Sequence, residues 1–350
     1  YEYHQLILDE AQNIKNPRAK AAQVVRQLKA RHRLCLTGTP MENHLGELWA
    51  LFYFLMPGFL YSQEIFNKKY RHPIEKRGDQ QLRQKLVNRI KPFILRRLKT
   101  DVAKELPEKT TIEVNIDMND QQSKLYEAVR ATMQENIQKI VAEKGFKRSQ
   151  IQILDALLKL RQVCCHPSLL KLDSVKTGQA HSAKLEQLMD MVVPMVEEGR
   201  KILIFSQFTS MLELIEQQLH HAEIGYVKLT GKTKKRDEVI TAFQSGQVPV
   251  FLISLKAGGV GLNLTAADTV IHYDPWWNPA AEDQASDRAW RIGQDKPVFV
   301  YKLITNKSIE EKILALQQNK AELAQSILST DHEGEAKLTE NDVMNLFEKF

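Results

Sequence analysis

The spacing of apolar and polar positions differs between the first, middle and last parts of the chain. Near the start, the apolar run 6–8 ends in Asp9 and Glu10, and a second short apolar run covers 34–36. Short runs of this kind are typical of buried strands, and the Asn16-Pro pair between them is typical of a helix start. The pattern predicts a strand, helix, strand unit of a parallel sheet, with Asn16 capping the helix.

The middle of the chain, from about residue 58 to 172, carries long helical periodicities and few strand signals. After Gly199, short apolar runs alternate with helical segments, which is typical of a doubly wound parallel α/β domain. The strands expected there are 202–205, 226–229, 250–254, 270–273 and 298–303. One face of a long closing helix is marked by Ile309, Ile313, Leu316, Leu323 and Ile327.

These patterns predict an α/β protein with four parts. The expected parts are the remainder of a first sheet lobe at 1–57, a helical insertion and linker at 58–172, a second parallel-sheet lobe at 173–305, and a bracing helix with the C-terminal tail at 306–350. The chain begins at Tyr1 rather than Met, inside an expected strand, so a fragment of a longer protein is the natural interpretation. We therefore expect the first lobe to be incomplete.

Composition narrows the class of protein. With 350 residues, 43% of them hydrophobic and 26% charged, the chain can bury two or three ordinary cores and lacks the composition of a disordered chain. No stretch approaches the ~18 consecutive apolar residues of a membrane span, so no membrane partner is expected. The three cysteines show no paired spacing, which favours a reducing compartment and makes the cytosol the default location.

Positive charge is concentrated in one segment. The chain has a formal net charge of +6, and residues 62–111 hold 14 Lys and Arg against 6 Asp and Glu. Within it, Arg96 and Arg97 stand beside the apolar residues Ile94 and Leu95, so a packed stem could present them to a phosphate backbone in a salt-sensitive way. The segment indicates a polyanionic partner; an amphipathic linker with a solvated face is the alternative.

The acid pair Asp9 and Glu10 follows a strand, where parallel α/β sheets place their ligands. Hydrolysis of a nucleoside triphosphate needs one carboxylate to hold Mg²⁺, usually through water, and another to orient and activate the attacking water. Two adjacent acids at a strand end can do both. An ordinary acid pair at a helix start is the alternative.

A second polar turn follows the run 34–36. Thr37, Gly38, Thr39 and Pro40 form a tight turn whose hydroxyl and backbone N–H groups can bond to a nearby carboxylate or phosphate. The alternative is a strand-to-helix turn capped by threonine.

Two arginines late in the chain are spaced for one helical face. Asn278 precedes proline at an expected helix start, and Gly293 is the expected end. Gln284, Arg288 and Arg291 stand at i, i+4 and i+7, which predicts that all three share a face and that two guanidinium groups can reach a γ-phosphate. A surface arginine stripe is the alternative.

A glycine-rich stretch, SLKAGGVGLNLTAA, covers 254–267 after an expected strand. Its glycines allow a positive φ, so that backbone N–H groups can face phosphate or ribose oxygens. It is not a P-loop, because no Lys-Ser or Lys-Thr follows, and the GKT at 231–233 lacks the required glycine at 226. In the adjoining YDPWWNP, Trp277 is either a DNA contact or a core residue.

Five strings together resemble the Swi/Snf family of superfamily-two helicase-like ATPases. They are ILDEAQNIKNP at 7–17, LCLTGTPMENHLGELWALFYFLMPG at 34–58, FILRRLKTDVAKELPEKT at 93–110, LRQVCCHPSLL at 160–170 and DQASDRAWRIGQ at 283–294. Ordered matches run from Ile7 to about Leu328. The strings at 93–110 and 160–170 are not typical of strand-separating helicases, which are the alternative class.

The resemblance implies two RecA-like (P-loop NTPase type) lobes, ATP and Mg²⁺ as cofactors, and these residue roles. Catalytic roles fall to Glu10 as general base and to Gln284, Arg288 and Arg291; nucleotide contacts to Asp9, Gly259, Gly261 and Asn263; and Mg²⁺ to Asp9 through water. DNA contacts fall to Thr37, Arg96, Arg97, Ser254, Lys256 and Trp277, the last against the minor groove.

The resemblance also implies a translocase on double-stranded DNA that remodels or displaces DNA-bound proteins. We expect a monomer, nucleoid-associated in the cytoplasm of a bacterium or nuclear in a eukaryote. The family's P-loop would lie upstream of Tyr1, so we expect this chain alone to bind ATP poorly and not to turn it over. A catalytically inactive DNA-binding fragment is therefore a further alternative.

Overall fold

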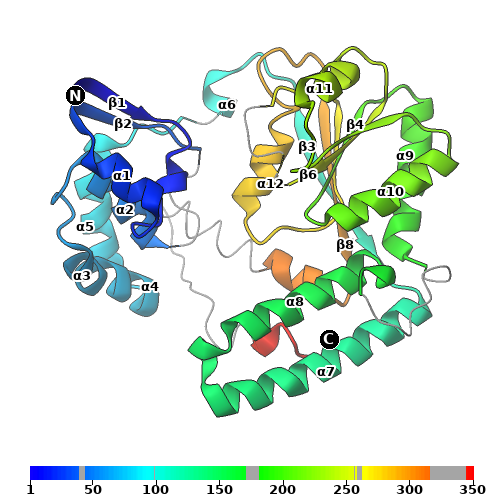
Figure 1. Ribbon diagram of the computed structural model, residues 1–350, viewed down its shortest axis with the longest axis horizontal. Helices are drawn as coiled ribbons and strands as arrows, with labels where there is room; N and C mark the ends of the chain where they lie inside the picture. Colours follow the sequence, from blue (N-terminus) through cyan, green and yellow to red (C-terminus); the bar gives the residue numbers. More distant parts are fainter. Residues whose placement is uncertain (39–43, 98, 171–180, 256, 258–261, 316–343) are drawn as a thin grey trace. The chain divides into compact units, whose positions relative to one another are not determined.

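A computed structural model describes residues 1–38, 44–97, 99–170, 181–255, 257, 262–315 and 344–350. These residues form two compact units, of which the first ends at Arg96 and the second begins at Arg97 (Figure 1). Within the described ranges, no helix is both long enough and apolar enough to cross a membrane.

The first unit contains a two-stranded parallel sheet followed by short helices. Its elements are β1 (Glu2–Leu8), η1 (Ala11–Ile14), α1 (Lys20–Gln27), β2 (Lys29–Cys35), α2 (Leu45–Leu55), α3 (Gln63–Phe66), η2 (Asn67–Arg71), α4 (His72–Arg77), α5 (Gln80–Ile90) and η3 (Lys91–Phe93). Ile7 lies opposite Leu34 in the sheet, which confirms the expected strand, helix, strand unit. The helix begins later than expected, because Asn16 Oδ1 accepts from the Arg18 amide in a turn before it.

Helix α2 is buried on nearly every side because almost all of its residues are apolar. Phe52, Trp49 and Leu48 pack with Phe66 of α3 and Leu86 of α5 in one core. Its first amide, that of Leu45, donates to the buried carboxylate of Glu75 at 2.8 Å. This side-chain cap joins α4 to the start of α2 and satisfies an amide that has no partner inside the helix.

The second unit is built on six parallel strands in the order β3-β8-β7-β4-β6-β5. The strands are β3 (Lys109–Ile116), β4 (Ile202–Ser206), β5 (Tyr226–Leu229), β6 (Val250–Ser254), β7 (Thr269–His272) and β8 (Val298–Thr305). All five strands expected after Gly199 are confirmed, most of them within one residue at each end. The chain is therefore an α/β protein with parallel sheets, as predicted.

Helices cover both faces of this sheet (Figure 1). The helices of the unit are α6 (Lys99–Val102), α7 (Asp120–Lys144), η4 (Phe146–Arg148), α8 (Gln150–Cys165), η5 (Pro167–Leu169), α9 (Ala183–Glu197), α10 (Thr209–His221), α11 (Arg236–Gln244) and α12 (Pro279–Ser286). One face packs Ile204 and Leu252 against α9 and α10. The other packs Phe205 and Phe251 against Phe243 of α11 and the α12 region.

Strand β3 lies in the segment expected to be helical. It pairs with β8 along its whole length, from Lys109 opposite Val298 to Ile116 opposite Thr305. The compact second unit accordingly begins at Arg97 and includes α7 and α8. The expected boundaries after 57 and 172 therefore do not coincide with the division into compact units.

The end of the chain packs on α7. Residues 309–315 are helical, and the side chain of Phe347 is fully buried. Arg130 Nη1 donates to the Phe347 carbonyl at 2.6 Å, and Lys312 Nζ donates to the Asn345 carbonyl at 2.8 Å. The rest of the expected closing helix, with Leu316, Leu323 and Ile327, lies outside the described residues.

Candidate functional site

The acid pair lies at the carboxyl end of β1, as predicted. Glu10 adopts the left-handed conformation (φ 48°, ψ 48°), and its amide donates to Asp9 Oδ1 at 2.9 Å. A left-handed residue with a side chain costs roughly 1–2 kcal/mol, so this turn is specified by its surroundings. The carboxylate of Asp9 is exposed, which suits a hard cation that takes oxygen ligands.

Glu10 is linked to the turn after β2 through a glutamine. Gln12 Nε2 donates to Glu10 Oε2 at 2.6 Å, and Thr37 Oγ1 donates to Gln12 Oε1 at 2.7 Å. Thr37 was expected to bond to a carboxylate or phosphate, and in the structure it bonds to the amide that holds the carboxylate. Thr39 and Pro40 of the same turn lie outside the described residues.

Helix α12 carries Gln284 but ends before the two arginines. Asn278 caps it as predicted, with Oδ1 accepting from the Ala280 amide at 3.1 Å, but the last helical residue is Ser286. Gln284 is exposed, Arg288 is buried, and Arg291 is exposed with Nη1 donating to the Leu262 carbonyl. The prediction that all three share one helical face is wrong.

Tertiary hydrogen bonds hold the turn that follows this helix. The Arg288 carbonyl accepts from the Leu264 amide at 3.0 Å, so the loop before β7 takes an acceptor that a longer helix would have used. Trp290 Nε1 donates to the Pro107 carbonyl at 2.7 Å, which fixes the indole on the segment before β3. Contacts distant in sequence thus outweigh the local helical preference.

Two lysines hold the turn beside the arginines. Lys99 Nζ donates to Asp287 Oδ2 at 2.8 Å, and Lys109 Nζ donates to Asp287 Oδ1 at 3.1 Å. Their ammonium groups lie 5.4 and 4.8 Å from the ring centroid of Trp290. Sequence reasoning missed this cluster, although both lysines stand in the string that resembles the family. It attaches the segment that opens the second unit to the turn carrying Arg288.

The carboxyl ends of β4, β6 and β7 meet at one edge of the sheet. Ser206 pairs with Ser254, and Ser206 Oγ donates to the buried Asp274 at 2.5 Å. Burial raises the pKa of Asp274 above its usual value, while Arg161 opposes that rise. Trp277 follows on the same loop and is partly buried.

Several predicted contacts of the glycine-rich stretch lie outside the described residues, namely Lys256, Gly259 and Gly261. Ser254 lies among the described residues and is buried at the end of β6. Asn263 is exposed, and its carbonyl accepts from Gln244 Nε2 at 3.2 Å.

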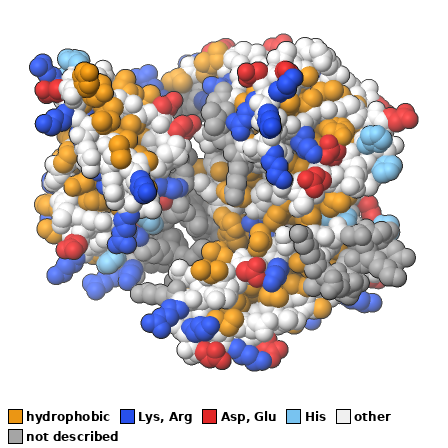
Figure 2. Space-filling model, viewed as in Figure 1, with side chains coloured by type: hydrophobic (Ala, Val, Ile, Leu, Met, Phe, Trp, Pro, Cys, Tyr) orange, Lys and Arg blue, Asp and Glu red, His pale blue; other side chains and the backbone are white. Residues whose placement is uncertain are grey.

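Arg96 and Arg97 are exposed and stand on either side of the division between the units. Ile94 packs partly against the first core, but Leu95 is 81% exposed, so the expected packed stem forms only in part. Lys and Arg side chains lie over both units on the face shown in Figure 2. Exposed basic side chains also lie outside the segment 62–111, Lys139 among them.

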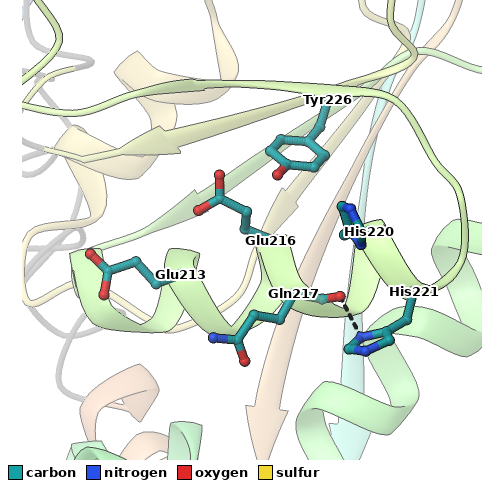
Figure 3. A pocket seen from close by; sticks show the side chains of 6 residues that line it. All are labelled: Glu213, Glu216, Gln217, His220, His221 and Tyr226. Carbon is teal, nitrogen blue, oxygen red and sulfur yellow. Dashed lines mark hydrogen bonds between the residues drawn. The ribbon is translucent and has the colours of Figure 1, made fainter.

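A pocket of about 420 Å³ lies between α10 and β5 of the second unit. Figure 3 shows Glu213, Glu216 and Gln217 along α10, with Tyr226 above them. His220 and His221 complete the lining, and Lys228 pairs with Glu216, so the lining has mixed charge and does not by itself indicate a nucleotide site. Among the described residues, no group of three His, Cys, Asp or Glu side chains is placed to hold a metal ion.

Comparison with known proteins places these features in a family. Residues 1–169 match the SNF2-related domain, and residues 183–293 match the helicase conserved C-terminal domain. The solved Sulfolobus solfataricus SWI2/SNF2 ATPase core in complex with dsDNA is 39% identical, with a TM-score of 0.54, over 94% of this chain and 69% of that chain. This chain belongs to the SWI2/SNF2 family. The resemblance found in the sequence is thereby confirmed.

Longer relatives include YwqA of Bacillus subtilis (strain 168), named as a candidate ATP-dependent helicase/translocase. It is 40% identical over 336 residues, which are 94% of this chain and 36% of YwqA. The SWI/SNF-related matrix-associated actin-dependent regulator of chromatin subfamily A member 1 of Homo sapiens is 37% identical over 92% of this chain and 32% of its own length. This SWI2/SNF2 chain spans about a third of the length of these relatives.

Proposed function

We propose that this chain is part of an ATP-driven translocase on double-stranded DNA that remodels or displaces DNA-bound proteins. The observation that carries the proposal is the hydrogen-bonded connection from Glu10 through Gln12 to Thr37. It joins an acid suited to triphosphate hydrolysis to a turn that we assign to DNA contact. A solved relative in complex with dsDNA supports the choice of duplex DNA.

ATP and Mg²⁺ fit the acid pair. The exposed carboxylate of Asp9 at the strand end offers oxygen ligands to Mg²⁺ directly or through water. Bound Mg²⁺ would supply neutralisation of phosphate charge. Glu10, held in one orientation by the Gln12 amide, is assigned as the general base that orients and deprotonates the attacking water.

The remaining assignments follow the family motifs. Arg288 and Arg291 are assigned to stabilise charge on the γ-phosphate, and Gln284 keeps its assigned catalytic role. Nucleotide contacts are assigned to Gly259, Gly261 and Asn263. DNA contacts are assigned to Thr37, Arg96, Arg97, Ser254, Lys256 and Trp277.

The test compares ATP hydrolysis by the full-length protein with duplex DNA, with single-stranded DNA and without DNA. We expect duplex DNA to stimulate hydrolysis most, and Arg291→Ala to lower the stimulated rate by about 10³-fold or more. An unchanged rate in Arg291→Ala would remove the arginine assignment. Displacement of a strand from a forked duplex would instead identify a strand-separating helicase.

A further inference from the structure

Arg161 lies on α8 and extends to the edge of the six-stranded sheet where the carboxyl ends of β4 and β7 meet. Its side chain is 3% exposed, and Nη2 donates to the Pro275 carbonyl at 2.6 Å. Nη2 also lies 3.8 Å from Asp274 Oδ2. The guanidinium carbon is 5.5 Å from the ring centroid of Trp277 and 5.9 Å from that of Phe208. One buried side chain therefore contacts the loops that follow both β4 and β7.

A buried guanidinium requires a compensating anion, and Asp274 provides it. The carboxylate of Asp274 also accepts from Ser206 Oγ and from the Gln207 amide. None of the described atoms accepts a hydrogen bond from Arg161 Nε. The position of Arg161 is therefore set by Asp274, the Pro275 carbonyl and two aromatic rings.

We propose that Arg161 is a positioning residue that holds Trp277 in the orientation required for binding duplex DNA. This inference rests on the proposed DNA contact of Trp277. Arg161 is too deeply buried to meet a phosphate itself, so its effect on affinity comes from ordering the 274–277 loop. When a loop becomes ordered only on binding, the conformational entropy lost offsets part of the favourable free energy of binding.

This role predicts a specific signature in salt titrations. A residue that neutralises a phosphate changes the slope of log K against log salt by about one, whereas a positioning residue lowers affinity at every salt concentration and leaves the slope unchanged. The loss caused by removing Arg161 should also disappear once Trp277 is absent, because the two act through the same contact.

The experiment measures binding of the 350-residue chain to a fluorescent duplex across a salt series. Replacing only Arg161 would leave Asp274 as an uncompensated buried charge, so the main variant is Arg161→Met with Asp274→Asn. A second variant, Arg161→Lys, keeps the charge but not the planar fork. The matched control is Lys184→Met with Glu310→Gln, which removes another buried ion pair of the same unit. Thermal unfolding of each variant verifies the fold.

We expect Trp277→Ala to weaken binding about tenfold. Both Arg161 variants should weaken binding several-fold without changing the slope of log K against log salt, whereas the control should bind as the wild type does. Adding Arg161→Met and Asp274→Asn to Trp277→Ala should cause no further loss of affinity.

If Trp277→Ala weakens binding while the Arg161 variants bind normally, the positioning role is overturned and the DNA contact stands. If Trp277→Ala binds normally, the proposed contact fails and the inference with it. A slope lowered by about one in the Arg161 variants would make Arg161 a direct phosphate contact and overturn the proposal.

Discussion

Thr37 Oγ1 donates a 2.7 Å hydrogen bond to Gln12 Oε1, although the two residues are 25 positions apart. The bond joins the turn after β2 to the turn after β1. Because the Gln12 amide also donates to Glu10, both ends of this side chain are occupied and its orientation is fixed. A displacement of the Thr37 turn therefore changes the position of an acid assigned to hydrolysis.

Replacing Thr37 with valine should slow DNA-stimulated ATP hydrolysis by the full-length protein about fivefold, the equivalent of one hydrogen bond of about 1 kcal/mol. Valine keeps the volume but cannot donate to Gln12. Thr37→Ser keeps the hydroxyl and should hydrolyse ATP at nearly the wild-type rate. Equal rates for the valine and serine variants would contradict the connection.

Neutralising Arg96 and Arg97 together should weaken binding of the chain to duplex DNA and lower the slope of log K against log salt by about two. Both side chains are exposed and so can meet phosphates. The matched control neutralises two basic residues elsewhere in the chain, Lys139 and Lys159, each of which is paired with an acid one helical turn away. If both double variants shift the slope equally, the two arginines have no special part in DNA binding.

Stability should fall in mild acid, and His272 is one of the histidines that cause this. Burial lowers its pKa from 6.5 to about 4, and no described atom bonds to its Nδ1. The unfolded chain takes up a proton near pH 6.5 and the folded chain only near pH 4, so up to roughly 3 kcal/mol is lost as pH falls through this window.

His272→Gln should reduce this pH dependence in urea unfolding, even if the variant is less stable at neutral pH. Part of the acid response should remain, because burial also lowers the pKa of His166 to about 4. The control is His181→Gln, because the His181 side chain is 74% exposed. Its stability should fall in acid as steeply as that of the wild type. A His272→Gln curve parallel to the wild-type curve would show that another group controls the acid response.

Removing only one member of the buried ion pair between Lys184 and Glu310 should lower the free energy of unfolding. The two residues are 1% and 0% exposed, and Glu310 also accepts from the Thr305 amide at 2.8 Å. Lys184→Met leaves a buried carboxylate without its cation and should cost about 3–5 kcal/mol of unfolding free energy. Lys184→Met with Glu310→Gln should recover most of that loss in urea unfolding, whereas additive losses would contradict a direct coupling.

Much of the second sheet could be predicted because its strands are short apolar runs buried on both faces. Residues 202–206 and 250–254 are fully or almost fully buried, so each strand is a nearly continuous apolar run in the sequence. Such a run can be recognised without knowing which strand lies beside it. β3 could not be found in this way. It is an edge strand that alternates Ile112, Val114 and Ile116 with polar residues, and the long helix α7 follows it directly in the sequence.

The candidate site was predictable where a motif is local and less so where it depends on distant contacts. Asp9, Glu10 and the Asn278 cap stand where the sequence placed them. The turn after Ser286 is held by bonds to Leu264 and Pro107, which periodicity cannot reveal. The clamp of Lys99 and Lys109 on Asp287 likewise needs residues far apart in the chain.

The pairing of β3 with β8 determines where the protein can be cut. A recombinant piece starting at residue 183, where the match to the helicase C-terminal domain begins, would lack β3 and leave β8 as an unprotected edge strand. Such a piece would tend to aggregate or to pair with another copy. A piece starting at Arg97 keeps the edge strand, and it is the natural unit for isolating this half of the molecule and for exchanging it between relatives.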